Sequence, residues 1–239
     1  MTALILPLLA AGLARAADPA ALQADDERYR HRDNPATLAQ SVDELRGRLK
    51  TEPDSPELLW RLGRGLVAQA NAVPGKGPKL ERLAEASKTL RDAVAKFPRD
   101  AQAHYWLASE MGAENEIRRT LGLARSMKSE LETTLTLDSS HAAAHQLLCE
   151  ELHQLPGIFG GDKKRAVREC EEALRLTPNE TSRYTALAEA YLAVKKSDEA
   201  VAVLRRVFGV ARPDDPASAP GDLKDARALL DRLTGPSKP

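Results

Sequence analysis

The sequence predicts an all-α protein, a helical solenoid of about four to five helix pairs with a C-terminal capping helix. Three observations predict it: a two-helix pattern recurs along most of the 239 residues, turn signals separate the recurrences, and aromatic residues make up only 4% of the chain. Few aromatic residues suit a helical core built from Leu, Ala and Val. In a solenoid each such unit packs only on its neighbours.

The clearest unit is the segment "YTALAEAYLAVKKSDEAVAVLRRV". Its first helix reads large-x2-Leu-small-x2-aromatic, and its second reads Ala-x3-large, which is the pattern of the tetratricopeptide repeat. The residues that match are Tyr184, Leu187, Ala188, Tyr191, Ala200, Leu204 and Val207.

The same unit can be traced upstream through its anchor residues. Each leading helix carries a large residue beside a small one, and each second helix carries one large residue. The leading-helix pairs are Leu62-Gly63, Leu107-Ala108, Leu148-Cys149 and Leu187-Ala188; the second-helix anchors are Leu45, Leu90, Leu131, Cys170 and Leu204. From each second helix to the next leading helix the spacing is constant, as from Leu45 to Leu62 and from Leu90 to Leu107, which predicts a regular stack.

The joint inside each unit varies in length. The spacing is 28 residues from Leu62 to Leu90, 24 in the next unit, 22 in the third and 17 in the last, so three joints carry 11, 7 and 5 extra residues. The first, around "NAVPGKGPKLERLAEA", is predicted to be mostly loop because of its Pro and Gly residues. The second, around "MGAENEIRRTLGLARSMK", is predicted to lengthen two helices. All three joints fall on one edge of the stack, which is predicted to be a binding edge.

Four segments follow from these patterns. They are a signal peptide at 1–16, an N-terminal linker and partial repeat at 17–54, the tetratricopeptide-like repeat domain at 55–212, and a Pro-rich linker with a capping helix at 213–239. In the partial repeat we expect one helix near Ala21 to His31 and a second from Asn34-Pro35, a good cap and first-turn pair, to about Lys50. The capping helix is expected from Leu223 to Leu233.

The N-terminus "MTALILPLLAAGLARAADPA" predicts export. An apolar run from Ala3 to Leu13 precedes Ala14-Arg15-Ala16, an A-x-A cleavage pattern. No basic residue precedes the run, so a chance apolar N-terminus is the alternative. No Cys follows it, which argues against a lipid anchor, and no run of about 18 apolar residues predicts an integral membrane segment. The expected localisation is periplasmic or secreted.

The balance of charge excludes some classes of partner. Lys plus Arg and Asp plus Glu number 35 each, so no net field favours nucleic acid or an anionic membrane, and no nucleic-acid partner is expected. Recognition must then depend on local surface. Whether the chain forms a homo-oligomer is left open.

The third joint, "LPGIFGGDKKRA", resembles a phosphate-binding loop only superficially. A phosphate loop needs G-x-x-x-x-G-K-[ST] after a strand, and neither the spacing nor the hydroxyl residue is present. A turn explains the residues better: Pro156 and Gly157 stop one helix, Gly160 and Gly161 permit positive φ, and Asp162 caps the next.

Ile158 and Phe159 are unusual at the tip of such a turn. Two interpretations are open: the pair folds back onto the neighbouring joint, which we favour, or it contacts a ligand or partner.

The segment "HAAAHQLLCEELH" places His or Cys at every fourth position. The four positions drift around a helix and span about 18 Å, so at most two adjacent residues could share a metal ion, and no metal site is predicted. Cys149 and Cys170 lie on the two helices of one unit, and both a disulfide and two buried thiols are open. No catalytic motif is found, so we expect a non-enzymatic protein without a cofactor.

Two segments, "HYWLASEMGAENE" and "LPGIFGGDKKRAVRECEEAL", resemble the TatT family, the T component of periplasmic tripartite (TRAP-type) transport systems. The resemblance covers about Ser55 to Arg212 and implies a helical accessory protein that associates with a periplasmic substrate-binding component and passes an apolar or organic-acid ligand through a pore in its body. The matching residues are Tyr105, Trp106, Leu155, Pro156, Gly157, Gly160, Gly161 and Asp162. The sequence lacks that family's lipoprotein Cys. Proteins that regulate microtubule dynamics share a related helical core, but the export signal argues against that setting.

The sequence therefore predicts a periplasmic repeat protein that mediates protein–protein interaction and binds a small apolar or organic-acid ligand as a transport accessory component. The alternative is a generic tetratricopeptide scaffold that binds a peptide on its concave face. The candidate ligand- or partner-binding residues are Tyr105, Trp106, His145, Ile158 and Phe159.

Overall fold

The computed structural model describes residues 18–235, and within that range every regular element is helical. Eleven α-helices and one short 3-10 turn, η1, are formed by these described residues. Their bounds are α1 Pro19–Arg30, α2 Pro35–Leu49, α3 Pro56–Ala72, α4 Lys76–Lys96, α5 Ala101–Arg118, α6 Leu121–Leu137, α7 Ala142–Gln154, η1 Gly157–Phe159, α8 Lys163–Leu176, α9 Ser182–Ala193, α10 Ser197–Val207 and α11 Ala219–Thr234. The predicted all-α solenoid is confirmed. The predicted signal peptide at 1–16 lies outside the described residues.

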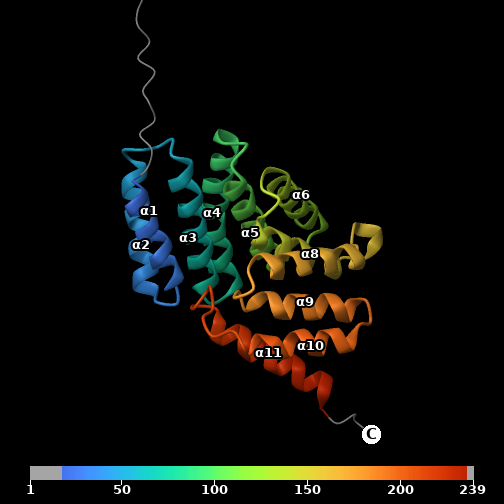
Figure 1. Ribbon diagram of the computed structural model, residues 1–239. Helices are drawn as coiled ribbons and strands as arrows, with labels where there is room; N and C mark the ends of the chain where they lie inside the picture. Colours follow the sequence, from blue (N-terminus) through green and yellow to red (C-terminus); the bar gives the residue numbers. More distant parts are fainter. Residues whose placement is uncertain (1–17, 236–239) are drawn as a thin grey trace, which may run out of the picture.

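The helices are arranged as antiparallel pairs that stack into a curved superhelix (Figure 1). Each helix packs on its neighbour in sequence, and α3 also packs on α5, and α7 on α9. In Figure 1 the first helices stand upright, whereas α8 to α11 run across the view, so the stack turns along its length. The expected capping helix is α11, which packs on α9 and α10. None of the described helices is long and apolar enough to cross a membrane.

Local signals set where the helices begin. The Asn34 side chain accepts hydrogen bonds from the amides of Ala36 and Thr37, with Pro35 in the first turn, so α2 begins where the cap pattern predicts. Asp162 likewise accepts from the amides at the start of α8. Capping side chains satisfy amide groups that have no partner inside their own helix.

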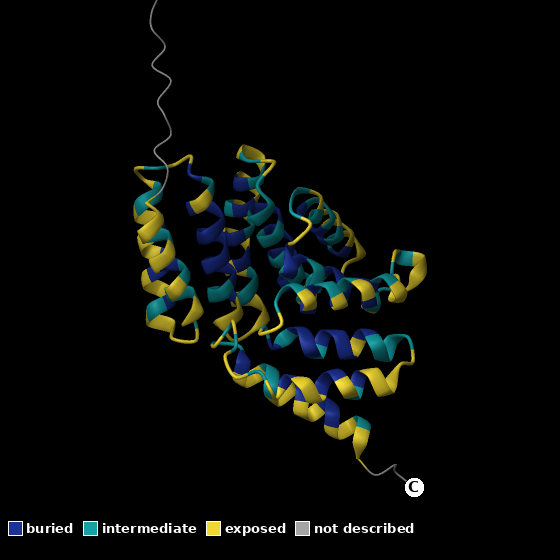
Figure 2. Ribbon diagram, viewed as in Figure 1, coloured by how far each residue is buried: buried dark blue, intermediate teal, exposed yellow. Residues whose placement is uncertain are grey.

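The anchor residues form the core between paired helices. Leu90 of α4 is fully buried, and a Cβ atom added at Gly63 of α3 would lie only 2.3 Å from its Cδ2 atom. A small residue beside the leading-helix Leu is therefore a packing requirement, because α3 and α4 approach too closely for a side chain there. Figure 2 shows the same arrangement along the stack: buried residues run along α3 and α9, while exposed residues cover the outer sides of α2 and α10.

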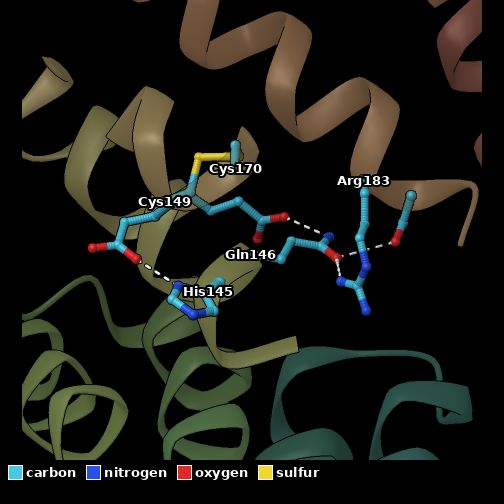
Figure 3. Close-up of a disulfide and its surroundings, with 8 residues drawn as sticks. His145, Gln146, Cys149, Cys170 and Arg183 are labelled. Carbon is cyan, nitrogen blue, oxygen red and sulfur yellow. Dashed lines mark hydrogen bonds and ion pairs between the residues drawn. A yellow bond between two sulfur atoms is a disulfide. The ribbon is translucent and has the colours of Figure 1, made fainter. Parts of the chain in front are cut away.

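In the third unit the same packing contact is a disulfide. Cys149 holds the small position of α7 and Cys170 holds the anchor position of α8, and their sulfur atoms are bonded across a Cα–Cα distance of 5.4 Å (Figure 3). The close approach that Gly63 permits in the first unit brings two cysteines within bonding range here. Of the two interpretations left open by the sequence, the structure has the disulfide.

The first expanded joint differs from its prediction. Only positions 73–75 between α3 and α4 are non-helical, so the expectation of a mostly looped segment is wrong. Gly75 makes the turn at φ 91°, and Pro78 falls in the first turn of α4, where its missing amide hydrogen costs no helical bond. The second joint is as predicted: α5 and α6 are long helices, and only Arg119 and Thr120 separate them.

The third joint is the tight turn that the sequence predicts. Gly160 adopts φ 96°, and a Cβ atom at Gly161 would lie 1.8 Å from the backbone oxygen of Leu155, so a side chain cannot be accommodated there. Phe159 is half-buried, but Ile158 is 85% exposed. The favoured interpretation, that both residues fold back onto the neighbouring joint, is therefore wrong for Ile158: the 3-10 turn directs its side chain into solvent.

Candidate functional site

The concave side of the superhelix holds two adjoining cavities. The inner compartment has a volume of about 570 Å³ and lies among α1, α3, α5, α7, α9 and the segment before α11. The outer compartment has a volume of about 770 Å³ and lies among α5, α6 and α7. Four residues line both compartments, namely Asn71, Ser109, Leu147 and Glu150. The two cavities therefore form one continuous groove.

Aromatic side chains form one wall of the inner compartment. Tyr29, Tyr105 and Trp106 line it, with ring centroids 5.9 Å apart for Tyr29 and Trp106 and 5.0 Å apart for Tyr105 and Trp106. Both pairs meet edge to face, which is a favourable geometry for aromatic rings. Burial raises the pKa of Tyr105 further above neutral pH, and its protonated hydroxyl can donate a hydrogen bond.

A buried arginine forms the opposite wall. Arg183 is 6% exposed, and its guanidinium group donates a hydrogen bond to the Gln146 side chain (Figure 3). It also donates to the Thr177 hydroxyl. Gln146 in turn donates to the Glu150 carboxylate over 2.9 Å. Within residues 18–235 no carboxylate lies within ion-pair distance of Arg183, and burial lowers the pKa of its guanidinium group. The inner compartment therefore contains a cation held by neutral acceptors.

The segment after α1 contacts the segment before α11 at the inner compartment. The Nη1 atom of Arg32, just after α1, donates to Asp215 Oδ1 over 2.9 Å, and its Nη2 atom donates to the Ser218 hydroxyl over 2.8 Å. Asp215 also accepts from the amides of Ala217 and Ser218, in the turn just before α11. This contact closes one side of the groove with residues that are far apart in sequence.

The outer compartment arises from a local separation of two leading helices. Tyr105 of α5 and His141 at the start of α7 have ring centroids 4.6 Å apart, so the helices meet near their N-terminal ends. Beyond that contact α5 and α7 do not pack as α3 and α5 do, and the outer compartment occupies the space between their C-terminal halves. Its apolar lining includes Ala113, Met127 and Leu155.

The groove is acidic although the chain as a whole is neutral. Burial raises the pKa of Glu180, to which repulsion from neighbouring carboxylates adds, and burial is also the largest cause of the raised pKa of Glu150. The acidic side chains that line the groove are Asp33, Glu116, Glu150, Glu151, Glu180, Asp215 and Asp222, whereas the basic ones are Arg32, Arg119 and Arg183. The excess of carboxylates favours a cationic occupant.

Two of the five predicted binding residues lie in the groove. Tyr105 and Trp106 line the inner compartment, whereas His145, Ile158 and Phe159 line neither compartment. The Nδ1 atom of His145 lies 2.6 Å from a Glu169 carboxylate oxygen, and that contact raises the pKa of the imidazole.

His145 holds a position that recurs in the stack. In each of the last three leading helices, the residue three positions before the anchor Leu is a histidine or a tyrosine. Its side chain donates a hydrogen bond to the backbone oxygen of the residue six positions earlier, in the turn that precedes the helix. The pairs are His104 and Pro98 at 3.1 Å, His145 and Ser139 at 3.1 Å, and Tyr184 and Pro178 at 2.8 Å. His145 therefore fixes a turn between units, which is a structural role.

Sequence reasoning missed groove residues that the repeat register could have identified. Relative to the anchor residues Leu107 and Leu148, the same positions of α5 and α7 face the groove. The equivalent residues are Tyr105 and Gln146, Trp106 and Leu147, and Ser109 and Glu150. Arg183 and the contact at Arg32 had no such signal, because they depend on the curvature of the stack.

Comparison with known proteins gives a family match. A family model described as "Regulator of microtubule dynamics protein 1-3" matches residues 22–150, more than half of the chain and the part that forms α2 to α6 and most of α1 and α7. No curated protein matches. The TatT family is not shown by any comparison.

Solved structures share the fold at low sequence identity. A thermophilic tetratricopeptide-repeat protein of Thermus thermophilus has a TM-score of 0.64 and 20% identity, covering 90% of this chain and 97% of that one. A MamA structure has a TM-score of 0.51 and 18% identity, covering 74% and 90%. MamA from Desulfovibrio magneticus RS-1, from residue 41 to its end, has a TM-score of 0.51 and 15% identity, covering 82% and 97%. The predicted tetratricopeptide-like fold is thereby confirmed.

Proposed function

The chain belongs to the regulator of microtubule dynamics protein 1-3 family, and from that membership and the groove we propose that it is a non-enzymatic scaffold that binds a segment of a protein partner on its concave side. The observation that carries this proposal is the continuity of the two compartments. A continuous groove along stacked leading helices suits an extended or helical segment better than a single compact ligand.

The lining of the groove supports this proposal. Tyr105 and Trp106 offer aromatic faces to apolar side chains, and the exposed amide of Asn71 lies at the junction of the compartments, where it can pair with a peptide backbone. The contact between Arg32 and Asp215 closes the inner end, so a bound segment is enclosed on several sides. Such a lining combines apolar anchors with a few polar groups that fix orientation.

Selection from a random peptide library on the full chain tests the proposal. Ser109 lines both compartments, so Ser109→Trp should fill their junction and abolish binding of the selected peptides. Ser129→Trp is the matched control, because Ser129 is exposed on α6 and lines neither compartment, and it should bind like the unmodified protein. Failure to select any peptide, or equal affinity for the Ser109→Trp variant, would refute the proposal.

A small organic acid is a second candidate occupant, as the predicted transport accessory role requires. Arg183 favours it, because a buried guanidinium group with only neutral acceptors can bind a carboxylate. Native mass spectrometry before and after organic extraction tests this candidate. An acid that co-purifies with the protein and is lost in Arg183→Gln supports it, whereas consistently empty protein eliminates it.

We further propose that the protein is exported. The most specific form of this proposal is that the protein acts with a periplasmic substrate-binding component. The disulfide between Cys149 and Cys170 supports export, because such bonds persist in oxidising compartments. The family name concerns microtubule dynamics, which makes tubulin the partner to test if the protein stays in a reducing compartment. The mass of the mature protein tests whether it is exported. We expect cleavage after Ala16, whereas an intact N-terminus with free thiols would refute export.

A further inference from the structure

We propose that the outer compartment binds a lysine or arginine side chain of the partner segment, with the carboxylate of Glu151 as its acceptor. This inference rests on the proposed function, because it assigns a chemical preference to one part of the peptide-binding groove. It names the kind of residue that the partner must place between α5 and α7.

Glu151 is a buried carboxylate without a partner. It lies on α7, lines the outer compartment and is 9% exposed. Its Oε1 atom is buried and makes no hydrogen bond, and no ion pair within residues 18–235 involves the group. The nearby cation Lys128 is engaged elsewhere, since its Nζ atom donates to the backbone oxygen of Gly160 over 3.0 Å. The compartment therefore contains an acceptor that the chain itself does not satisfy.

An unsatisfied buried carboxylate is unfavourable, and a ligand cation would correct it. Burial raises the pKa of Glu151, which reflects the cost of keeping charge in this position. A bound ammonium or guanidinium group would supply both the opposite charge and the missing hydrogen bond. Glu150 lines the same compartment and adds negative potential. Glu116 also lines it but is paired with Lys79, and Arg119 is the basic residue in this lining, so carboxylates still outnumber cations there.

The walls of the compartment suit the rest of a basic side chain. Met127, Leu147 and Leu155 line it together with Glu151. Lysine and arginine carry apolar stems of three or four carbon atoms below the charged group, and such stems pack on apolar surface while the charge reaches a polar partner. The volume of about 770 Å³ leaves room for the side chain and the backbone that carries it. A small metal ion does not use such walls, so the occupant is an amphipathic cation.

The test uses the full chain and peptides selected from the random library described above. The expected result is a Lys or Arg at one fixed position in the selected peptides. A peptide with norleucine at that position keeps the stem and loses the charge, and it should bind the unmodified protein about tenfold more weakly. Glu151→Gln should remove this difference between the two peptides. The matched control is Glu110→Gln, which changes another buried carboxylate, on the opposite side of α5.

The outcomes separate the inference from the proposed function. Two outcomes would overturn the inference and leave the groove proposal intact. In the first, Ser109→Trp abolishes peptide binding, but the selected peptides show no preference for Lys or Arg. In the second, the norleucine peptide still binds the Glu151→Gln variant tenfold more weakly than the basic peptide does. If no peptide binds at all, both fail. Equal loss of the difference in Glu110→Gln would show that the effect comes from overall charge, and this would also overturn the assignment to Glu151.

Discussion

Replacing Glu110 with Gln should stabilise the protein above neutral pH. Glu110 lies on α5, facing α4, and is 1% exposed, and its Oε2 atom is buried without a hydrogen-bond partner. Burial raises the pKa of Glu110 to about 7, and repulsion from Glu114 adds to the effect. The group therefore destabilises the folded state once it ionises.

The magnitude follows from the pKa difference between the folded and unfolded states. Below about pH 4.5 Glu110 is protonated in both states and has no unfavourable effect. As the pH rises to about 7, the unfolded chain ionises first, so the stability of the folded state falls. With a folded-state pKa of about 7 against 4.5 for the free side chain, and about 1.4 kcal/mol per pKa unit, the loss reaches about 3 kcal/mol. Glu110→Gln keeps the shape of the side chain and removes this loss.

Urea denaturation followed by circular dichroism measures the effect at pH values from about 4 to 8. The unfolding free energy of the variant relative to the unmodified protein should rise across this range by about 3 kcal/mol, with most of the rise between about pH 4.5 and 7. Glu81→Gln is the control, because Glu81 is exposed on α4 and its replacement removes no buried charge. A difference that stays constant with pH would refute the reasoning, because it would mean that Glu110 ionises equally well in both states.

Three further predictions concern the packing of the stack. Replacing both Cys149 and Cys170 by Ala should lower the unfolding free energy by about 3 kcal/mol, which is the chain-entropy value for cysteines separated by 21 residues. Denaturation of the unmodified protein with and without reductant checks this value, and equal denaturation midpoints would contradict it. Gly63→Val should destabilise the protein by about 2 kcal/mol or more, since its Cβ atom would overlap Leu90; thermal unfolding measures the loss. Arg32→Ala should open the inner end of the groove. Amide hydrogen exchange at 212–222 should then rise at least severalfold, and unchanged exchange would mean that Arg32 does not hold the segment before α11.

The pattern of the groove could be predicted only in part. Tyr105 and Trp106 were identified from the sequence. Their equivalents on α7, Gln146 and Leu147, could have been predicted as well, because the repeat register places the same positions on the same face. His145 was also predicted to bind, and it lies outside the groove. A histidine on a helix offers no sign in sequence that its ring bonds to Glu169 and to a backbone oxygen.

The sequence by itself determined the helical solenoid, the register of its units, the caps at Asn34 and Asp162, and the need for a small residue at Gly63. These features are local or periodic, so spacing and residue type are enough to specify them. Only the tertiary structure decided that Cys149 bonds to Cys170 and that Arg32 meets Asp215. The tertiary structure also decided the separation of α5 from α7. The curvature of a stack accumulates from many small packing angles, so the sequence of any one unit does not specify it.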